Sequence, residues 1–312
     1  MSSQAVPTGA APVVLVVDTG VDDAAALLVA GASPELAVAA VACCAGNAAL
    51  GDVVDNTRAV LALAGRNDIE ICSGASAPLT RPPPPPGSSG HGSTGRGYAR
   101  LPEHLAPLSR RVAVEALVAL ARQRAGELTV VALAPLTDVA LAVEREPRLP
   151  DLLRRLVVMG GLRPDATAAE TNLRRDPAAA HVVARAWRAA GQRPLVIGVD
   201  VTRSVTLRPL DIETVARGAG ARSPLLDYLR AALRGYAEHN AAAAGVDGSY
   251  LHDAVAVAGV LQPRLLDVRA MPDGTDAAVA VDVDAARALV VGRLIRALRQ
   301  AHPRASPKPG RV

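Results

Sequence analysis

Residues 13–31 read VVLVVDTGVDDAAALLVAG: five apolar residues, a short stretch with three aspartates, and a second apolar run. The unbroken apolar run at residues 13–17 predicts a strand buried on both faces, as in a parallel sheet. The second apolar run predicts a helix that begins close to the aspartates Asp18, Asp22 and Asp23. A strand that passes directly into a helix is the repeating unit of an α/β fold.

The alternation of short apolar runs and helical patterns continues along the chain. It predicts an α/β fold: a doubly wound, mainly parallel sheet flanked by helices, in a single domain. The predicted strands are residues 13–17, 36–43, 69–72, 128–133, 156–159, 194–199 and 278–283. The predicted helices are residues 22–30, 51–64, 110–124, 136–144, 177–190, 223–240, 252–261 and 285–298. We expect the domain to cover residues 13–300, between a disordered lead-in (1–12) and a disordered tail (301–312).

Composition excludes several classes of protein. Half of the 312 residues are hydrophobic but only 2% are aromatic, so the core must consist of Ala, Val and Leu. The net charge of +4 comes without a basic cluster interleaved with aromatics, which argues against nucleic-acid binding. No run of about 18 apolar residues and no secretory signal pattern is present, so we expect a cytoplasmic protein without a membrane span. The three cysteines are expected to be buried, reduced thiols.

The longest irregular stretch is RPPPPPGSSGHGSTGRGYARLPE, residues 81–103. Its prolines favour an extended conformation, and the Gly and Ser residues that follow favour mobility. Loops of this length in compact domains are usually functional or disordered. We therefore expect residues 82–96 to be poorly ordered without ligand and to act as a lid.

The three aspartates stand where ligands bind in an open parallel sheet, beyond the carboxyl end of a strand. Carboxylates crowded at one place repel each other unless a cation lies between them, and oxygen ligands suit Ca²⁺ or Mg²⁺. The simpler alternative is that Asp22 and Asp23 cap the helix, which leaves Asp18 unexplained. Other polar residues also follow predicted strands or begin a helix; these are Asn47, Thr137, Glu170, Asn172, His252 and Asp253.

These motifs resemble, in order, the blocks of the inosine-uridine nucleoside hydrolase family. VVDTGVDD stands at the family pattern Asp-x-Asp-Pro-Gly-x-Asp-Asp, and Asn47 follows Asp18 at the family's spacing. The further matching blocks are SGASAPLTR, HGSTG, APLTDVALA, VVMGG, AAETNLRRDPAAAHVV, VIGVDVT and DGSYLHDAVAVA. The resemblance covers roughly residues 13–263 and implies a nucleoside hydrolase-like fold.

The resemblance implies a Ca²⁺-dependent enzyme that hydrolyses the N-glycosidic bond of a ribonucleoside to ribose and free base. Asp18 would be the general base acting on a Ca²⁺-bound water, and His252 the acid that protonates the departing base. The implied metal ligands are the side chains of Asp18, Asp23 and Asp253 and the carbonyl oxygen of Leu133. The implied substrate-binding residues are Asp22, Asn47, His91, Met159, Glu170, Asn172 and Asp253. His91 would approach the nucleobase from the loop, and a homodimer or homotetramer is implied.

The chain departs from the family pattern at several positions. Val16 replaces the first aspartate, which removes a hydrogen-bond partner next to the metal site. Thr19 replaces the proline, Thr171 replaces an aromatic residue near the ribose, and Arg203 replaces a histidine. The loop at 162–169 is shortened, although Asp165 there is a candidate contact to the 5′-hydroxyl. The segment between residues 266 and 281 is also short.

These departures keep a second interpretation open: a catalytically weak paralogue that binds a ribosyl ligand. Val16 and Thr171 are the residues that favour it. A third interpretation, a Mg²⁺-dependent phosphohydrolase, is disfavoured because Thr-Gly-Val follows Asp18 where one large phosphatase class has Asp-x-Asp.

Overall fold

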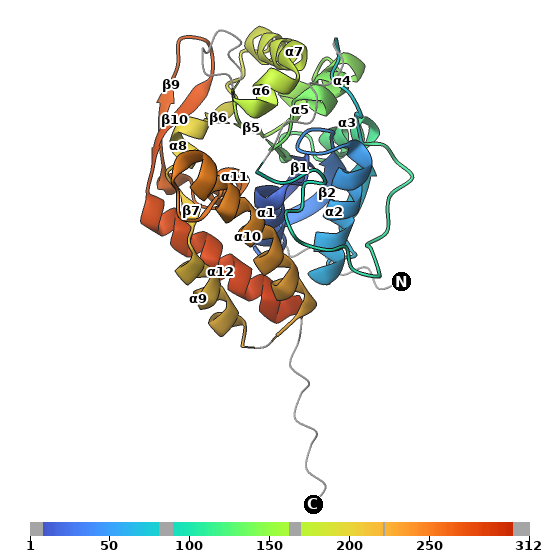
Figure 1. Cartoon of the computed structure of the whole chain (residues 1–312). Coiled ribbons are helices and arrows are strands. Elements are labelled where there is room, and N and C mark those ends of the chain that lie inside the picture. The colour runs from blue at the N-terminus through green and yellow to red at the C-terminus, as the bar shows by residue number, and fades with distance from the viewer. Residues whose placement is uncertain (1–8, 81–89, 162–169, 221, 302–312) are drawn as a thin grey trace, which may run out of the picture.

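The computed structural model describes residues 9–80, 90–161, 170–220 and 222–301 (Figure 1). Eight of the described strands form one sheet in the order β3-β2-β1-β4-β5-β6-β10-β9. Neighbouring strands are parallel except for the pair β10 and β9. The strands are β1 (Ala11–Val17), β2 (Leu36–Cys43), β3 (Glu70–Ser73), β4 (Thr129–Ala132), β5 (Arg155–Met159), β6 (Leu195–Ile197), β9 (Leu266–Ala270) and β10 (Asp276–Val281).

Helices cover both faces of this sheet. Successive side chains of a strand point to opposite faces, and the apolar side chains on each face are buried against helices. Leu15 and Val17 of β1 pack in one hydrophobic core, whereas Val14 and Val16 pack in the other. The first core includes α1 (Val21–Gly31), α2 (Leu50–Leu63), α9 (Pro209–Ala219), α10 (Pro224–Ala244), α11 (His252–Leu261) and α12 (Val283–Ala301). The second includes α3 (Ala113–Gln123), α4 (Thr137–Arg145), α5 (Leu149–Leu152) and α7 (Pro177–Ala189). The predicted doubly wound α/β fold is confirmed.

Most differences from the predicted elements lie in the second half of the chain. The predicted strand at 194–199 is shorter, because the chain turns at Gly198 into α8 (Val199–Thr202). A two-stranded ribbon of β7 (Thr206–Leu207) and β8 (Ser249–Tyr250) was not predicted, since two residues carry no periodicity. The helices α5, α6 (Thr171–Arg175), α8 and α9 and the strand β9 were also missed. In Figure 1 the helices α9, α10 and α12 lie together at the lower left.

The core has the composition that the sequence predicts. Ala, Val and Leu fill both faces, and Cys43, Cys44 and Cys72 are buried free thiols. Helix α1 is buried along nearly its whole length, which explains why it is apolar on every side. Among the described residues, no helix combines the length and the apolar character that crossing a membrane requires.

A core substitution tests this description. Leu15→Ala removes a side chain that is 1% exposed in the first core, and we expect it to lower the free energy of unfolding by about 2–5 kcal/mol. The matched control is Leu210→Ala on α9, where the side chain is 66% exposed and the change should stay within about 0.5 kcal/mol. Urea denaturation measures both. Similar losses for the two variants would contradict the assignment of Leu15 to the core.

Candidate active site

Three carboxylates meet beyond the carboxyl end of β1. One carboxylate oxygen each from Asp22, Asp23 and Asp253 lies within 4.8 Å of the others, and all three side chains are buried. Asp22 and Asp23 belong to the first turn of α1, and Asp253 to the first turn of α11. The positive ends of two helix dipoles therefore face the same group of negative charges.

Asp18 lies beside this group and is held by Asn47. The backbone N–H of Asn47 donates to Asp18 Oδ2 at 2.7 Å, and its Nδ2 donates to Asp18 Oδ1 at 3.2 Å. The same Nδ2 donates to Asp23 Oδ2 at 3.3 Å, so one amide joins both aspartates. Only glycine fits at position 46, because a Cβ there would lie 1.9 Å from Asp18 Oδ2. The turn after β2 thus fixes the orientation of Asp18.

The carboxylates are incompletely paired. Among the described residues, Asp22 Oδ1 and Asp23 Oδ1 are buried and have no hydrogen-bond partner. Burial raises the pKa of Asp22 to about 6, and burial together with Asp22 raises the pKa of Asp23 to about 7. Burial and neighbouring carboxylates also raise the pKa of Asp18 and of Asp253 well above the usual value. Buried carboxylate oxygens without hydrogen-bond partners, gathered in one place, are suitable ligands for a hard cation such as Ca²⁺.

The predicted ligand set and the observed group differ in one member. The predicted set joins Asp18 to Asp23 and Asp253, whereas the oxygens closest together belong to Asp22, Asp23 and Asp253. Both oxygens of Asp18 accept hydrogen bonds from Asn47, which accounts for its place at the side of the group. All four carboxylates are therefore candidate ligands, and their division between metal and substrate stays a prediction.

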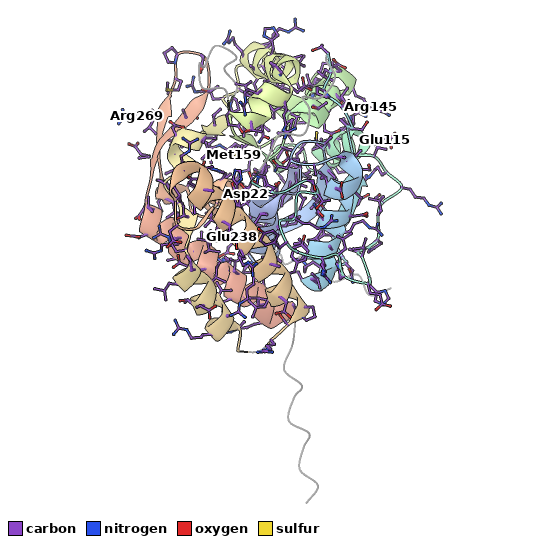
Figure 2. The ribbon with its side chains drawn as sticks, viewed as in Figure 1. Asp22, Glu115, Arg145, Met159, Glu238 and Arg269 are labelled. Carbon is purple, nitrogen blue, oxygen red and sulfur yellow. The ribbon has the colours of Figure 1, made fainter. Side chains whose placement is uncertain are left out.

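A cavity of about 480 Å³ opens above the carboxylates. Asp22 and Met159, which both line it, lie near the centre of Figure 2. Asp18 and Asp23 do not line it, but both accept hydrogen bonds from Asn47, which does. The other predicted residues in its wall are Asn47, His91, Leu133, Glu170, Asn172, His252 and Asp253. The cavity therefore brings together residues from the carboxyl ends of four strands and from α11.

Glu170 and Asn172 are fixed by local hydrogen bonds. Glu170 caps α6, where Oε1 accepts from the N–H of Asn172 at 2.9 Å and Oε2 from the N–H of Leu173 at 3.1 Å. Asn172 Nδ2 donates at 2.8 Å to the carbonyl oxygen of Leu133, the predicted main-chain ligand. Gly160 has φ +127°, and a Cβ there would lie 2.5 Å from Glu170 Oε2. The side chain of Asn172 thus links α6 to the main chain that follows β4.

His91 is held against the start of α1. Its Nδ1 accepts a hydrogen bond from the N–H of Val21 at 3.1 Å and lies 3.8 Å from Asp22 Oδ1. Its ring lies 4.6 Å from that of Tyr236, and burial lowers its pKa to about 4. His91 is therefore a neutral, buried side chain beside Asp22.

The described part of the predicted lid is anchored to the domain. Gly97 donates from its N–H to the carbonyl of His91 at 2.8 Å, and Asn56 Nδ2 donates to the carbonyl of Thr94 at 2.8 Å. Arg96 also contacts α2, through Asn56 Oδ1 at 3.0 Å. The remainder of the predicted lid, residues 82–89, lies outside the described residues.

His252 is the first residue of α11 and lines the cavity next to Asp253. Its Nδ1 lies 2.8 Å from Thr202 Oγ1, and its ring stacks on Tyr250 with centroids 5.1 Å apart. Burial, with smaller contributions from His91 and Arg203, lowers its pKa to about 3. His252 is thus oriented from two sides.

One face of α10 supplies much of the outer wall: Tyr236, His239, Asn240 and Ala243. Their helical spacing of three, one and three is readable from the sequence, but it does not reveal which face of the helix meets the cavity. Val199 and Tyr250 also line the cavity and carried no recognisable sequence signal.

The departures from the family pattern have clear structural settings. Val16 is fully buried in the second core, and Asp18 keeps its contacts with Asn47 without a carboxylate there. Thr19 Oγ1 lies 2.6 Å from Thr57 Oγ1 of α2. Thr171 and Arg203 line the cavity. Asp165 lies outside the described residues.

The chain belongs to the inosine-uridine preferring nucleoside hydrolase family, whose model matches residues 13–309. It is 32% identical to uridine nucleosidase 1 of Arabidopsis thaliana over 80% of this chain and 74% of that one. It is 35% identical to the pyrimidine-specific ribonucleoside hydrolase RihA of Enterobacter sp. (strain 638), over 82% and 80% respectively. The predicted family and enzyme class are confirmed.

Solved structures agree on the fold. A plant nucleoside hydrolase, PpNRh1, aligns with a TM-score of 0.79 at 28% identity, over 91% of this chain and 99% of that one. A purine-preferring ribonucleoside hydrolase from Gardnerella vaginalis aligns with a TM-score of 0.83 at 24% identity, over 92% and 99%.

The raised pKa values predict how stability depends on pH. Because Asp22 and Asp23 have pKa values of about 6 and 7, the metal-free native state binds more protons than the unfolded chain between pH 4 and 7. Their contribution to stability is therefore present at low pH and lost as pH rises through 6 to 7. A bound cation replaces these protons, so Ca²⁺ should stabilise more at pH 7.5 than at pH 5.

Thermal unfolding in Ca²⁺ and in EDTA, from pH 5 to 7.5, measures this difference. The double variant Asp22→Asn, Asp23→Asn keeps Asp18 and Asp253, so in this control the pH dependence of the Ca²⁺ effect should become smaller. A Ca²⁺-induced shift of Tm that is the same at every pH would contradict the prediction.

Proposed function

We propose that this chain hydrolyses the N-glycosidic bond of a ribonucleoside, with Ca²⁺ held by the buried carboxylates, and releases ribose and the free base. The observation that carries the proposal is the group of Asp22, Asp23 and Asp253, with two orphaned oxygens, of which Asp22 and Asp253 line a cavity of about 480 Å³. A cavity of this volume suits a small ligand such as a nucleoside.

The residues that would hold Ca²⁺ are Asp18, Asp23, Asp253 and the carbonyl oxygen of Leu133, with Asp22 next to them. The donors are all oxygen atoms, which fits Ca²⁺ rather than Zn²⁺. When bound, Ca²⁺ would act as a Lewis acid that orients hydroxyl groups and lowers the pKa of water.

Asp18 is the residue that we assign as general base. Burial, followed by the neighbouring Asp23, raises its pKa well above the usual value, and Asn47 holds both of its oxygens. A carboxylate with raised proton affinity accepts a proton from water more readily near neutral pH. Asp18 therefore takes a proton from the water that attacks C1′ of the ribose.

The carboxylates also stabilise the sugar as the bond breaks. Cleavage of a glycosidic bond passes through a ribosyl group with oxocarbenium character. Asp22 and Glu170 place negative charge in the cavity wall, and Asn47 and Asn172 add amide groups that can bind hydroxyls. These four residues bind the ribose, and Met159 packs beside it.

His252 donates a hydrogen bond to the departing base. It lines the cavity beside Asp253, and its ring stacks on that of Tyr250. A hydrogen-bond donor there stabilises the negative charge that develops on the base, and a positioned acid typically contributes about 10²–10⁴-fold. Tyr236 and His239 also line the cavity and are the alternative candidates for this role.

We favour a pyrimidine ribonucleoside, with uridine as the first to test. The support is the names of two relatives, a uridine nucleosidase and a pyrimidine-specific ribonucleoside hydrolase. The environment of Val16 supports an enzyme over a weak paralogue, because Asp18 remains fixed without a carboxylate at position 16. We further propose a homodimer or homotetramer in the cytoplasm, as the resemblance implies.

Asp23→Asn tests the metal and the activity together. We expect it to abolish tight Ca²⁺ binding and uridine hydrolysis while the circular dichroism spectrum is kept, because it removes a buried ligand charge. Calorimetric titration with Ca²⁺ and assays for free base and reducing sugar measure the two effects. Asp227→Asn, at an exposed position of α10, is the matched control. Full hydrolysis by EDTA-treated protein, or no hydrolysis of any nucleoside in Ca²⁺, would overturn the proposal.

His252→Ala tests the role at the base. A general acid matters most when the leaving group is poor, so the variant should lose roughly 10²-fold or more in turnover of uridine. It should retain turnover of p-nitrophenyl riboside, whose leaving group needs no proton. Equal losses on the two substrates would show that His252 is structural or that Tyr236 or His239 delivers the proton.

A further inference from the structure

We propose that Thr202 is a positioning residue that sets the tautomer and the ring orientation of His252. The inference rests on the proposed function, in which His252 serves the departing base. Thr202 Oγ1 lies 2.8 Å from His252 Nδ1, and Thr202 is fully buried at the end of α8. Fifty residues separate the two, so this is a tertiary contact.

The direction of this hydrogen bond follows from the hydroxyl. Among the described residues, His252 Nδ1 is the one partner of Thr202 Oγ1. A buried hydroxyl that only accepted would leave its own proton without an acceptor, which is unfavourable. Thr202 therefore donates and Nδ1 accepts. A neutral imidazole has one N–H, so the proton of His252 lies on Nε2.

The backbone around Thr202 holds it in place. Thr202 donates from its N–H to the carbonyl of Gly198 at 3.0 Å, which fixes it in α8. Directly beyond, β7 pairs with β8, and Leu251 donates from its N–H to the carbonyl of Val205 at 3.1 Å. The two segments that carry Thr202 and His252 are thus joined by main-chain hydrogen bonds.

Tyr250 restricts the ring from another direction. Its ring stacks on that of His252 with an interplanar angle of 25°. Tyr250 covers one face of the ring, and Nδ1 is hydrogen-bonded to Thr202. Nε2 is therefore the ring nitrogen that is available to hydrogen-bond a ligand in the cavity that His252 lines. In this tautomer Nε2 donates a hydrogen bond to the base as the electron pair of the glycosidic bond moves onto it. The other tautomer would present a lone pair and repel that charge.

Thr202→Val removes the hydroxyl and keeps the shape of the side chain, and Thr202→Ser keeps the hydroxyl. In the Ca²⁺-loaded protein, ¹⁵N-¹H correlation spectra of the histidine rings report the tautomer, with His252→Ala identifying the signal. We expect wild type and Thr202→Ser to show the Nε2–H form, and Thr202→Val to show a mixture.

The kinetic test compares two leaving groups. Thr202→Val should lower kcat for uridine by about 10-fold, a part of the roughly 10²-fold or more that His252→Ala removes. It should change p-nitrophenyl riboside by no more than about twofold, since that leaving group needs no donor. Thr202→Ser should restore uridine turnover. Adding Thr202→Val to His252→Ala should cause no further loss, because the two residues act as one unit.

An Nδ1–H tautomer in the wild type, or equal losses on both substrates, would overturn the role of Thr202. Failure of the proposed function has a different signature. A protein that hydrolyses no nucleoside refutes the hydrolase, while the spectra of wild type and Thr202→Val still decide whether Thr202 sets the ring of His252.

Discussion

The burial of four carboxylates in one place is the constraint on which the rest of this structure depends. Asp18, Asp22, Asp23 and Asp253 are all buried, and their raised pKa values report the cost of keeping charge there. Two helix N-termini, those of α1 and α11, reduce that cost by directing positive dipole ends at the group. The amide of Asn47 reduces it further. What remains unpaired is a charge that a divalent cation would balance.

This arrangement also explains why the sheet and its helices must pack closely. Helix α11 comes more than two hundred residues after α1, yet both pack in the same core and deliver their first turns to one place. A shift of either helix would separate Asp253 from Asp22 and Asp23. The fully apolar character of α1 follows from this, because the helix lies between the sheet and the later helices and has no solvent face.

Periodicity in the sequence predicts much of the fold and part of the site. Three elements, β1, β2 and α7, begin and end within two residues of their predicted limits. Each is long and regular in pattern. The aspartates after β1 are likewise visible as charges in an apolar setting. The ribbon of β7 and β8, and the partner of His252, depend on contacts between distant segments that no local pattern records. The family resemblance supplied the roles of Glu170 and Asn172, which the local sequence marked only as polar residues near the end of a predicted strand.

The floor and the outer wall of the cavity belong to different parts of the chain. The floor consists of turns after strands, where Gly46 and Gly160 leave no space for a larger residue. The outer wall comes largely from one face of α10, whose residues end in the cavity and carry none of the carboxylates. Substitutions along that face can therefore alter which base fits while the carboxylate geometry stays intact. The base selectivity of such an enzyme can therefore change during evolution through variants that all remain active.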